Sequence, residues 1–384
     1  MKRAFALALM LSAAFAPPAF AAADTDGPPI ARQGYLFAGG KYATVKGQQV
    51  MSGQIYAEFQ IPRNQTHPYP IVMVHGAIQT GTNFTGTPDG RMGWAEYFLR
   101  QGYAVYVVDQ PGRARAGYSA DISGEQAFPD IKATQQRFTA PEKFNLWPQA
   151  KLHTQWPGSG LAGDPIFDQF YASQVPFVRT PVQAQTMTRD GLAALLDKIG
   201  PAVVMTHSQS GAMGWLIADA RPNLVKALIQ VEPSGPALHD VDMVGAPDYL
   251  RDGAATRPWG LTAIPITYAP AVRDPAQLSF VLDEKPAGPG LARCWLQKGQ
   301  ARQLPNLKMP IVVVNGEASF HAPFEHCTVK YLQQAGVKAD WLDLGKAGIH
   351  GNGHMMMLEK NNLEVAAAIE KWLAKAMPDQ RAAK

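Results

Sequence analysis

The feature that most constrains the fold of this chain is an alternation of short apolar runs, rich in β-branched residues, with longer stretches of helical periodicity. Each short run is apolar on both faces and ends in glycine, proline or polar residues, which is typical of strands. We predict strands at residues 70–74, 104–109, 202–205, 227–231 and 310–315, and helices at 94–101, 182–199, 211–219, 322–334 and 363–376. This order of strands and helices, βαβ throughout, predicts an α/β fold with a mostly parallel sheet covered by helices on both faces.

Two long segments, at residues 111–179 and 233–307, interrupt the alternation. Loops of this length in a compact domain are usually functional lids or disordered linkers. Their aromatic content favours lids: it includes Phe128, Trp147, Trp156, Phe167, Phe170, Tyr171 and Trp259. We therefore expect a single domain at residues 22–384 that carries two cap or lid insertions and no internal repeat.

The N-terminus has the composition of an export signal, because two basic residues precede an apolar run at residues 4–20 that ends in small residues. Two prolines interrupt the run, and it is shorter than the roughly 20 apolar residues that span a bilayer. We predict a signal peptide at residues 1–21, cleaved after Ala21 or Ala23, and a periplasmic or secreted mature protein. No membrane span is expected in the remainder of the chain.

The charge of the chain excludes one class of partner. The formal net charge is +4 over 384 residues, and the basic residues are scattered. Proteins that bind nucleic acid usually carry a clustered basic stripe. We therefore expect no nucleic-acid partner.

The chain has two cysteines, Cys294 and Cys327. In an oxidising compartment a disulfide between them would close a loop and stabilise the fold, so we predict that they pair. The alternative is two buried free thiols. Two cysteines without CxxC spacing do not indicate a metal site.

The strongest chemical signal lies where a predicted strand runs into a predicted helix through Thr206-His207-Ser208-Gln209-Ser210. A serine on such a tight turn exposes its hydroxyl as a nucleophile, and the next backbone N–H, that of Gln209, faces the oxyanion that develops. Small polar residues replace the glycines usual at positions 206 and 210. Ser210 is the rival nucleophile, and a helix N-cap serine is the purely structural alternative. The register from the strand end favours Ser208.

A second oxyanion donor is expected in the loop Val74-His75-Gly76-Ala77-Ile78, which follows the strand predicted at 70–74. The donor would be a backbone N–H, for which we favour Ala77. Ile78 is the alternative, because a backbone donor leaves no side-chain signature. We expect His75 to pack and hydrogen-bond within this loop rather than to act in catalysis.

The general base is expected near the C-terminus, where two histidines compete in His350-Gly351-Asn352-Gly353-His354. His354 stands at the end of the glycine-containing loop, just before a helical run, which is the usual setting of a catalytic histidine. We therefore favour His354 over His350. The spacing of four also suggests a zinc pair, but the intervening glycines disfavour the helix that would align the two rings.

Two carboxylates are candidates for the acid that orients this histidine. Glu232 ends the strand at 227–231, and Glu317 follows the strand at 310–315. Both positions can reach a loop histidine, and the later strand is the more usual one. The residues alone leave this choice open.

These motifs resemble secreted bacterial esterases of the esterase 713 type, a Ser-His-Glu branch of the α/β-hydrolase superfamily. The likeness covers residues 71–372 apart from most of the two insertions. It rests on TPDGRMGW at 87–94, EYFLR at 96–100, PVQAQ at 181–185, HSQSG at 207–211, VEP at 231–233 and HGNGHMMM at 350–357. The resemblance implies the α/β-hydrolase fold and a triad of Ser208, Glu232 and His354, and so favours Glu232 over Glu317.

One departure from that family concerns the oxyanion loop. Where a member of that family carries two adjacent cysteines after His-Gly, this chain has Ala77-Ile78. A loop stiffened by a neighbouring disulfide cannot be assumed here. The donor geometry and the substrate range therefore do not transfer from the resemblance.

The sequence thus predicts a carboxylesterase that forms an acyl-enzyme and needs no metal or organic cofactor. The substrate is expected to be a small to medium carboxylic ester or a lactone, because aromatic insertions favour an apolar, lidded pocket. A lactonase, amidase, polyester hydrolase or acyltransferase on the same scaffold stays open, as does a non-catalytic binding protein. The sequence does not determine the acyl or alcohol specificity. It also leaves the oligomeric state open, with a homodimer as one option.

Overall fold

The computed structural model describes residues 27–378. The signal peptide predicted at residues 1–21 lies outside this range. Between residues 27 and 378, no helix combines the length and the apolar character needed to cross a membrane.

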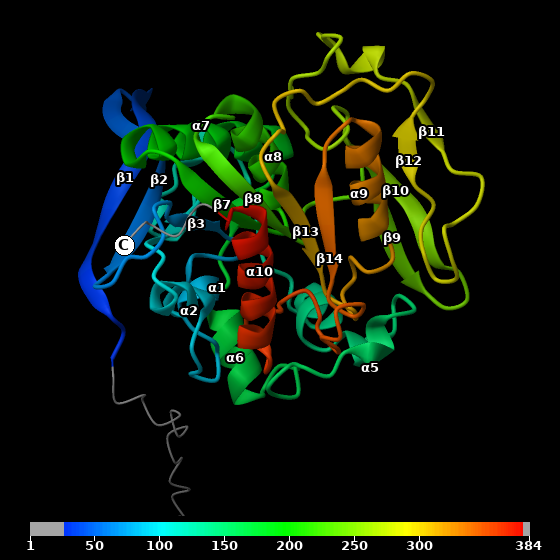
Figure 1. Cartoon of the computed structure of the whole chain (residues 1–384), viewed down its shortest axis with the longest axis horizontal. Coiled ribbons are helices and arrows are strands. Elements are labelled where there is room, and N and C mark those ends of the chain that lie inside the picture. The colour runs from blue at the N-terminus through cyan, green and yellow to red at the C-terminus, as the bar shows by residue number, and fades with distance from the viewer. Residues whose placement is uncertain (1–26, 379–384) are drawn as a thin grey trace, which may run out of the picture.

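An eight-stranded sheet forms the centre of the molecule (Figure 1). Its strands, in spatial order, are β1 (Ile30–Val45), β2 (Gln48–Pro62), β4 (Val105–Asp109), β3 (Ile71–Val74), β7 (Ala202–His207), β8 (Val225–Val231), β13 (Ile311–Asn315) and β14 (Ala339–Asp343). The strands from β4 through β14 in this order are parallel. The carboxyl ends of β3, β7, β8 and β13 therefore lie side by side at one edge of the sheet, where open parallel sheets bind their ligands.

Helices cover both faces of the sheet. They are α1 (Thr82–Thr85), α2 (Trp94–Arg100), α7 (Pro181–Ile199), α8 (Ser210–Ala220), α9 (Glu325–Gln334) and α10 (Asn362–Ala376). Strand residues such as Val72 and Val204 share one buried cluster with α7, α8 and α9, whereas Ile71 and Val203 share the opposite cluster with α2 and α10. Because successive strand side chains point to opposite faces, each buried strand contributes to both cores.

All five predicted strands and all five predicted helices are present, with ends that shift by up to three residues. The expectation of a βαβ order throughout is wrong at the N-terminus. There β1 and β2 form an antiparallel hairpin that joins the sheet at β4. Much of β1 is exposed, so it lacks the continuous apolar run that identifies a buried parallel strand.

The two insertions are irregular but folded. The first contains η1 (Ala114–Ala116), α3 (Ala120–Ser123), β5 (Gln126–Ala127), α4 (Ile131–Thr134), η2 (Gln135–Thr139), α5 (Pro141–Phe144), η3 (Ala150–Leu152), α6 (Pro165–Ala172) and β6 (Phe177–Val178). The second contains β9 (Leu238–Gly245), β10 (Tyr249–Arg257), η4 (Pro275–Gln277), β11 (Phe280–Leu282) and β12 (Trp295–Gln297). Of the aromatic side chains that suggested lids, five are buried inside the molecule: Trp147, Trp156, Phe167, Phe170 and Trp259.

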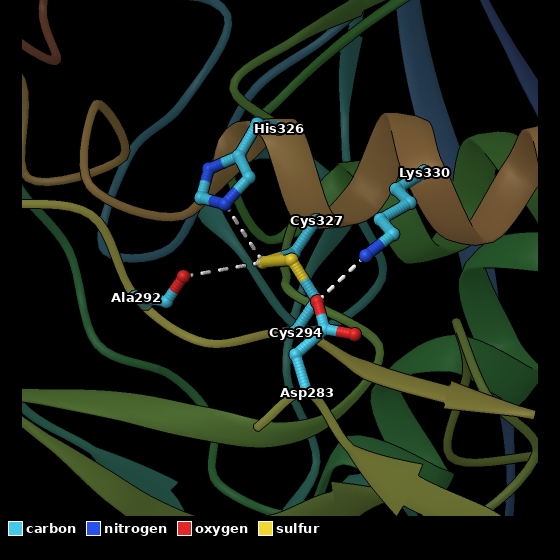
Figure 2. The surroundings of a disulfide bond; sticks show 6 residues. All are labelled: Asp283, Ala292, Cys294, His326, Cys327 and Lys330. Carbon is cyan, nitrogen blue, oxygen red and sulfur yellow. Dashed lines mark hydrogen bonds and ion pairs between the residues drawn. A yellow bond between two sulfur atoms is a disulfide. The ribbon is translucent and has the colours of Figure 1, made fainter. Parts of the chain in front are cut away.

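The second insertion is attached to α9 by two cross-links (Figure 2). Cys294, just before β12, forms a disulfide with Cys327 on α9. One turn further along the helix, the Lys330 ammonium lies 2.7 Å from the Asp283 carboxylate. The disulfide restricts the unfolded chain, so it favours the folded arrangement of these segments.

Candidate active site

Ser208 occupies the sharp turn between β7 and α8. Its φ of +56° lies in the left-handed region, which residues other than glycine rarely adopt. The turn is held by its backbone: the Ser208 carbonyl accepts from the N–H groups of Gly211 and Ser234, each at 2.9 Å. A Cβ atom at Gly211 would lie 2.3 Å from Pro233, so the turn requires a small residue there. The half-buried Ser208 hydroxyl makes no hydrogen bond within residues 27–378, which leaves it free to react.

Glu232 and His354 form a fully buried hydrogen-bonded pair beside this turn. His354 Nδ1 donates to Glu232 Oε2, which also accepts from Ser319 Oγ at 2.6 Å, and Gly316 N–H donates to Glu232 Oε1 at 2.7 Å. Burial raises the pKa of the Glu232 carboxyl, and the donors Ser319 and Gly316 oppose that rise by stabilising the carboxylate. Burial lowers the pKa of His354 well below its ordinary value, so the ring is held neutral.

The other ring nitrogen of His354 is not used in this pair. Nε2 is buried and has no hydrogen-bond partner within the described part of the chain. The His354 carbonyl lies 3.0 Å from Nε2 of His207, the residue before Ser208, and the two rings are 4.5 Å apart. The His354 loop is therefore packed directly against the turn that carries Ser208.

The rival residues occupy other places. His350 Nδ1 lies 3.1 Å from Glu317 Oε1, and the Glu317 carboxylate also accepts from Gly351 N–H. This pair lies near the surface, with the His350 side chain 65% exposed. The Ser210 hydroxyl is fully buried and bonded to the Val74 and His207 carbonyls. The structure thus brings Glu232 together with His354, and Glu317 with His350.

The loop after β3 lies against the serine turn. A Cβ atom at Gly76 would be 2.8 Å from Ser208 Cβ. The backbone N–H groups of Ala77, Ile78 and Gln209 donate no hydrogen bond to residues 27–378, so all three are available to an oxyanion. Ile78 has a φ of +57°, which marks a second sharp reversal of the chain.

His75 is fully buried in this loop. Its Nε2 accepts from Gln110 N–H at 3.2 Å, and its Nδ1 donates to the Gly76 carbonyl at 2.9 Å. Burial, together with the charge of Arg113, lowers the pKa of His75 to about 3. A neutral ring with both nitrogens bonded is a packing element, as the sequence led us to expect.

A second histidine–glutamate pair lies next to His354 and was missed from the sequence. His321 Nδ1 is 2.8 Å from Glu325 Oε2, and the His321 ring stacks on the His354 ring at 5.0 Å with an interplanar angle of 13°. Phe138 and Phe320 complete the ring cage around His354, at 5.1 and 4.5 Å. The available signal was the i, i+4 spacing of His321, which precedes α9, and Glu325, its first residue. Nothing local connected them with His354.

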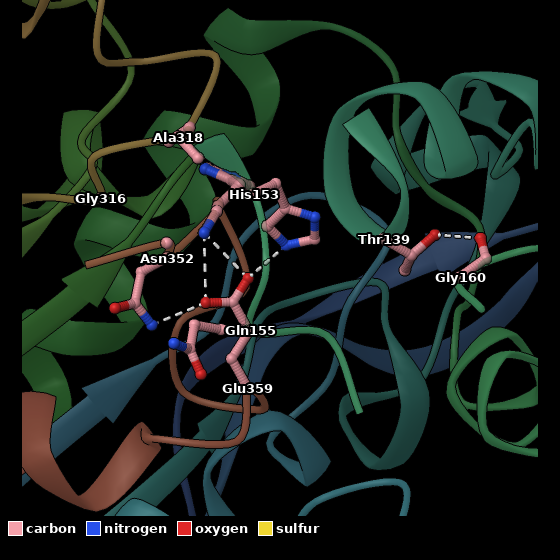
Figure 3. A network of polar contacts seen from close by, with 12 residues as sticks. Thr139, His153, Gln155, Gly160, Gly316, Ala318, Asn352 and Glu359 are labelled. Atoms are coloured by element: carbon pink, nitrogen blue, oxygen red, sulfur yellow. Dashed lines mark hydrogen bonds and ion pairs between the residues drawn. The ribbon is translucent and has the colours of Figure 1, made fainter. Parts of the chain in front are cut away.

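A polar network between the first insertion and residues 352–359 holds the His354 loop from the other side (Figure 3). Buried Glu359 accepts from His153 Nε2 at 2.8 Å, from Asn352 Nδ2 at 2.7 Å and from Gly353 N–H at 2.9 Å. His153 Nδ1 lies 2.8 Å from the carboxylate of Glu142 on α5. One buried imidazole thus joins the first insertion to the loop that precedes His354.

Two groups of side chains have the donor atoms of a metal site. Donor atoms of Glu232, His321 and His354 lie within 4.8 Å of one another. The Glu232 oxygens already accept three hydrogen bonds, so a metal would have to displace the Glu232–His354 pair. In the second group, His326 lies beside Cys294 and Cys327, whose sulfurs are joined in the disulfide and are not thiolate ligands.

A cavity of about 200 Å³ adjoins the serine turn. Gln209 and Ser234 line it together with Met213 on α8, Gln185 on α7 and Arg257 on β10. The lining combines apolar side chains, among them Pro181, Ala184 and Met213, with polar ones. Asp240 of β9 and Thr256 of β10 are among the polar lining residues.

Comparison with known proteins agrees with this architecture. Residues 71–368 match the model of the alpha/beta hydrolase family. The chain belongs to this family. The α/β-hydrolase fold class that the sequence predicted is therefore confirmed.

Two proteins similar to this α/β hydrolase are named lipases, and one solved structure of similar fold is named an esterase. The probable secreted lipase phiG of Fungal sp. (strain ATCC 74256) is 45% identical over 343 residues, which is 89% of each chain. Lipase LipV of Mycobacterium tuberculosis (strain ATCC 25618 / H37Rv) is 42% identical over 101 residues, 24% of this chain and 36% of that protein. The solved structure of a novel bacterial esterase is 24% identical, covers 90% of this chain and 96% of its own, and has a TM-score of 0.57, so it supports the fold alone.

Proposed function

We propose that this α/β hydrolase is a serine carboxylesterase that cleaves small to medium carboxylic esters through an acyl-enzyme. The observation that carries the proposal is the buried hydrogen bond between Glu232 and His354, beside a serine in left-handed conformation at the end of the neighbouring strand. This set of three groups is the one that converts a serine hydroxyl into a nucleophile at neutral pH. We assign the triad to Ser208, His354 and Glu232.

In the first step, Ser208 Oγ attacks the ester carbonyl carbon and His354 Nε2 takes the hydroxyl proton. Glu232 keeps the proton of the ring on Nδ1 and stabilises the imidazolium that forms. The oxyanion is bound by the backbone N–H groups of Gln209 and Ala77. His354 then protonates the departing alcohol. Water, deprotonated by His354, attacks the acyl-enzyme, and the released acid leaves Ser208 restored.

The relatives support the ester as the bond attacked. The protein at 45% identity is named a lipase, and the sequence resembles esterases of the esterase 713 type. The same machinery also serves a lactonase, amidase, polyester hydrolase or acyltransferase, because fold and triad do not fix the acyl acceptor. The cavity of about 200 Å³ beside Gln209 has room for a small to medium acyl or alcohol group rather than a long chain.

We also propose that the protein is exported. The N-terminal signal-like sequence supports this, as does the relative named a probable secreted lipase. A disulfide in the folded chain suits an oxidising compartment. N-terminal sequencing of the mature protein, expected to begin at residue 22 or 24, tests the proposal.

The test of function is hydrolysis of p-nitrophenyl esters from acetate to octanoate by the wild type and by Ser208→Ala, with labelling by a fluorophosphonate in parallel. We expect activity on the shorter esters, labelling of Ser208, and loss of both in Ser208→Ala by about 10³-fold or more. A wild type that neither labels nor hydrolyses any ester would support the rival view of a non-catalytic binding protein.

A further inference from the structure

Arg113 is a buried cation next to the serine turn that the proposed mechanism does not use. It follows β4, its side chain is 2% exposed, and it forms no ion pair within residues 27–378. The nearest carboxylate on the same segment, Asp109, is bonded instead to Arg115 and to Gly81 N–H. Burial lowers the pKa of Arg113 to about 9, so the guanidinium still carries its charge at neutral pH. An unpaired buried charge is costly, so its contacts call for an explanation.

Those contacts join the two halves of the expected oxyanion hole. Arg113 Nη1 donates to the Gly76 carbonyl at 2.6 Å, and Nη2 donates to Gln209 Oε1. The guanidinium also lies over the Phe177 ring of the first insertion, 5.4 Å from its centre. The planar guanidinium of Arg113 therefore bridges the loop after β3 and the side chain of Gln209, the residue after Ser208.

The Gly76 carbonyl belongs to the peptide whose N–H is that of Ala77. A trans peptide is planar and its C=O and N–H point in opposite directions, so fixing the oxygen also fixes the direction of the Ala77 N–H. The second expected donor is held in the same way. The Ser208 carbonyl, in the peptide that carries the Gln209 N–H, accepts from Gly211 and Ser234. Both donor peptides are thus oriented through their carbonyl oxygens.

We propose that Arg113 is a positioning residue of the oxyanion hole, which sets the Gly76–Ala77 peptide against Gln209 and adds positive potential where the oxyanion develops. The inference rests on the proposed esterase function. It accounts for how a loop with Ala77 and Ile78, which has no covalent restraint, keeps its shape. It also assigns the second donor to Ala77 rather than to Ile78, because the Ala77 peptide is the one that the guanidinium holds.

The test compares Arg113→Met and Arg113→Lys with the wild type, using p-nitrophenyl butyrate as substrate and an alkyl trifluoromethyl ketone as inhibitor. Removing an oxyanion contact lowers kcat while leaving KM nearly unchanged, and we expect a loss in kcat of about 10- to 100-fold for Arg113→Met. Affinity for the ketone, which forms an oxyanion at the same site, should fall in the same proportion as kcat/KM. Arg113→Lys should be intermediate, since an ammonium cannot span both acceptors.

Arg115→Lys is the matched control. It lies two residues away and pairs with Glu58 and Asp109, and within residues 27–378 its side chain forms no hydrogen bond to Gly76 or Gln209. It should keep kcat and ketone affinity. Thermal melting of each variant separates a folding defect from a catalytic one. In a folded Arg113→Ala variant, added guanidinium ion should restore part of kcat, which a purely structural role would not predict.

The outcomes separate the two proposals. If folded Arg113→Met keeps wild-type kcat and ketone affinity while Ser208→Ala is inactive, the role of Arg113 is wrong and the esterase stands. If Arg113→Met raises KM and leaves kcat unchanged, Arg113 binds substrate and does not position the oxyanion donors. If the wild type is inert and Ser208→Ala behaves identically, the esterase function fails and the Arg113 inference fails with it.

Discussion

Ile78, Ser208 and Glu232 share one unusual backbone feature. Each has a positive φ, of 57°, 56° and 46°, at or near the carboxyl end of β3, β7 and β8 respectively. A left-handed conformation costs a residue other than glycine roughly 1–2 kcal/mol. All three reversals lie at the same edge of the sheet. Backbone strain of this kind is often found at functional sites. The neighbouring contacts of Glu232 and Ser208 hold them in place against that cost.

The choice of acid gives a prediction at the residue scale. We expect Glu232→Gln to lower kcat by about 10³-fold or more, because an amide cannot stabilise the imidazolium and can force the wrong ring tautomer. Glu317→Gln removes the contact to exposed His350 and should keep kcat within about threefold. The measurement is p-nitrophenyl butyrate hydrolysis by both variants. An inactive Glu317→Gln beside an active Glu232→Gln would assign the acid to the other strand.

At the scale of elements, the loop that carries His354 is held by contacts from the first insertion. His153 lies between two carboxylates, Glu142 of α5 and Glu359 of the loop before α10, and Glu359 in turn holds the Gly353 N–H next to His354. Burial alone would lower the pKa of His153, but the hydrogen bonds to Glu142 and Glu359 outweigh it and raise the pKa to about 9. The insertion is thus joined to the loop by a charged imidazole.

This network gives a prediction for stability against pH. The folded-state pKa of His153 lies above the unfolded value of 6.5, so its stabilisation is fully present below about pH 6.5 and is lost as pH rises through about 9. The difference in free energy of unfolding between wild type and His153→Gln should shrink by up to about 3 kcal/mol between pH 6 and pH 9.5. Urea unfolding at several pH values measures it. His350→Gln is the control, and a difference that does not vary with pH would mean that His153 is not charged in the folded protein.

At the scale of the whole molecule, the N-terminal hairpin widens the sheet and packs across α7. The contact depends on Gly191, in the middle of α7, where an added Cβ would lie 2.5 Å from Ile55 Cγ2 of β2. Gly39 of β1, with a φ of +67°, also approaches Gly191, since a Cβ there would lie 2.9 Å from the Gly191 Cα. Close backbone approach explains why a helix interior keeps a residue that normally weakens it.

The packing of the hairpin predicts the effect of a substitution at Gly191. Alanine in place of glycine normally stabilises a helix by up to about 1 kcal/mol. Here we expect Gly191→Ala to lower the free energy of unfolding by about 1–3 kcal/mol, because the methyl group overpacks the buried Ile55. Denaturant unfolding measures whether the free energy of unfolding falls or rises. The Gly191→Ala, Ile55→Ala double variant should lose less free energy of unfolding than the sum of the two single losses, because the smaller side chain at position 55 relieves the clash. A Gly191→Ala variant more stable than the wild type would refute the clash.

The amino-acid sequence by itself determined the elements whose signals are local. The apolar runs at 70–74 and 202–205 became β3 and β7, the helical periods became α7 and α10, and the small residues around Ser208 marked the turn that the structure contains. The hairpin β1–β2 escaped prediction because its half-exposed strands carry no continuous apolar run. Apolar periodicity and the steric demands of a tight turn involve residues close together in the sequence, so the sequence shows them.

Only the tertiary structure decided which side chains meet. Glu232 and Glu317 follow neighbouring strands, β8 and β13, so the sequence places both near the histidine loop; the paths of the loops then pair Glu232 with His354 and Glu317 with His350. The contact of Arg113 with Gly76, 37 positions apart, and that of His153 with Glu359, 206 apart, have no local signature. Such contacts depend on how parallel strands are ordered in the sheet, and that order results from the packing of the whole molecule.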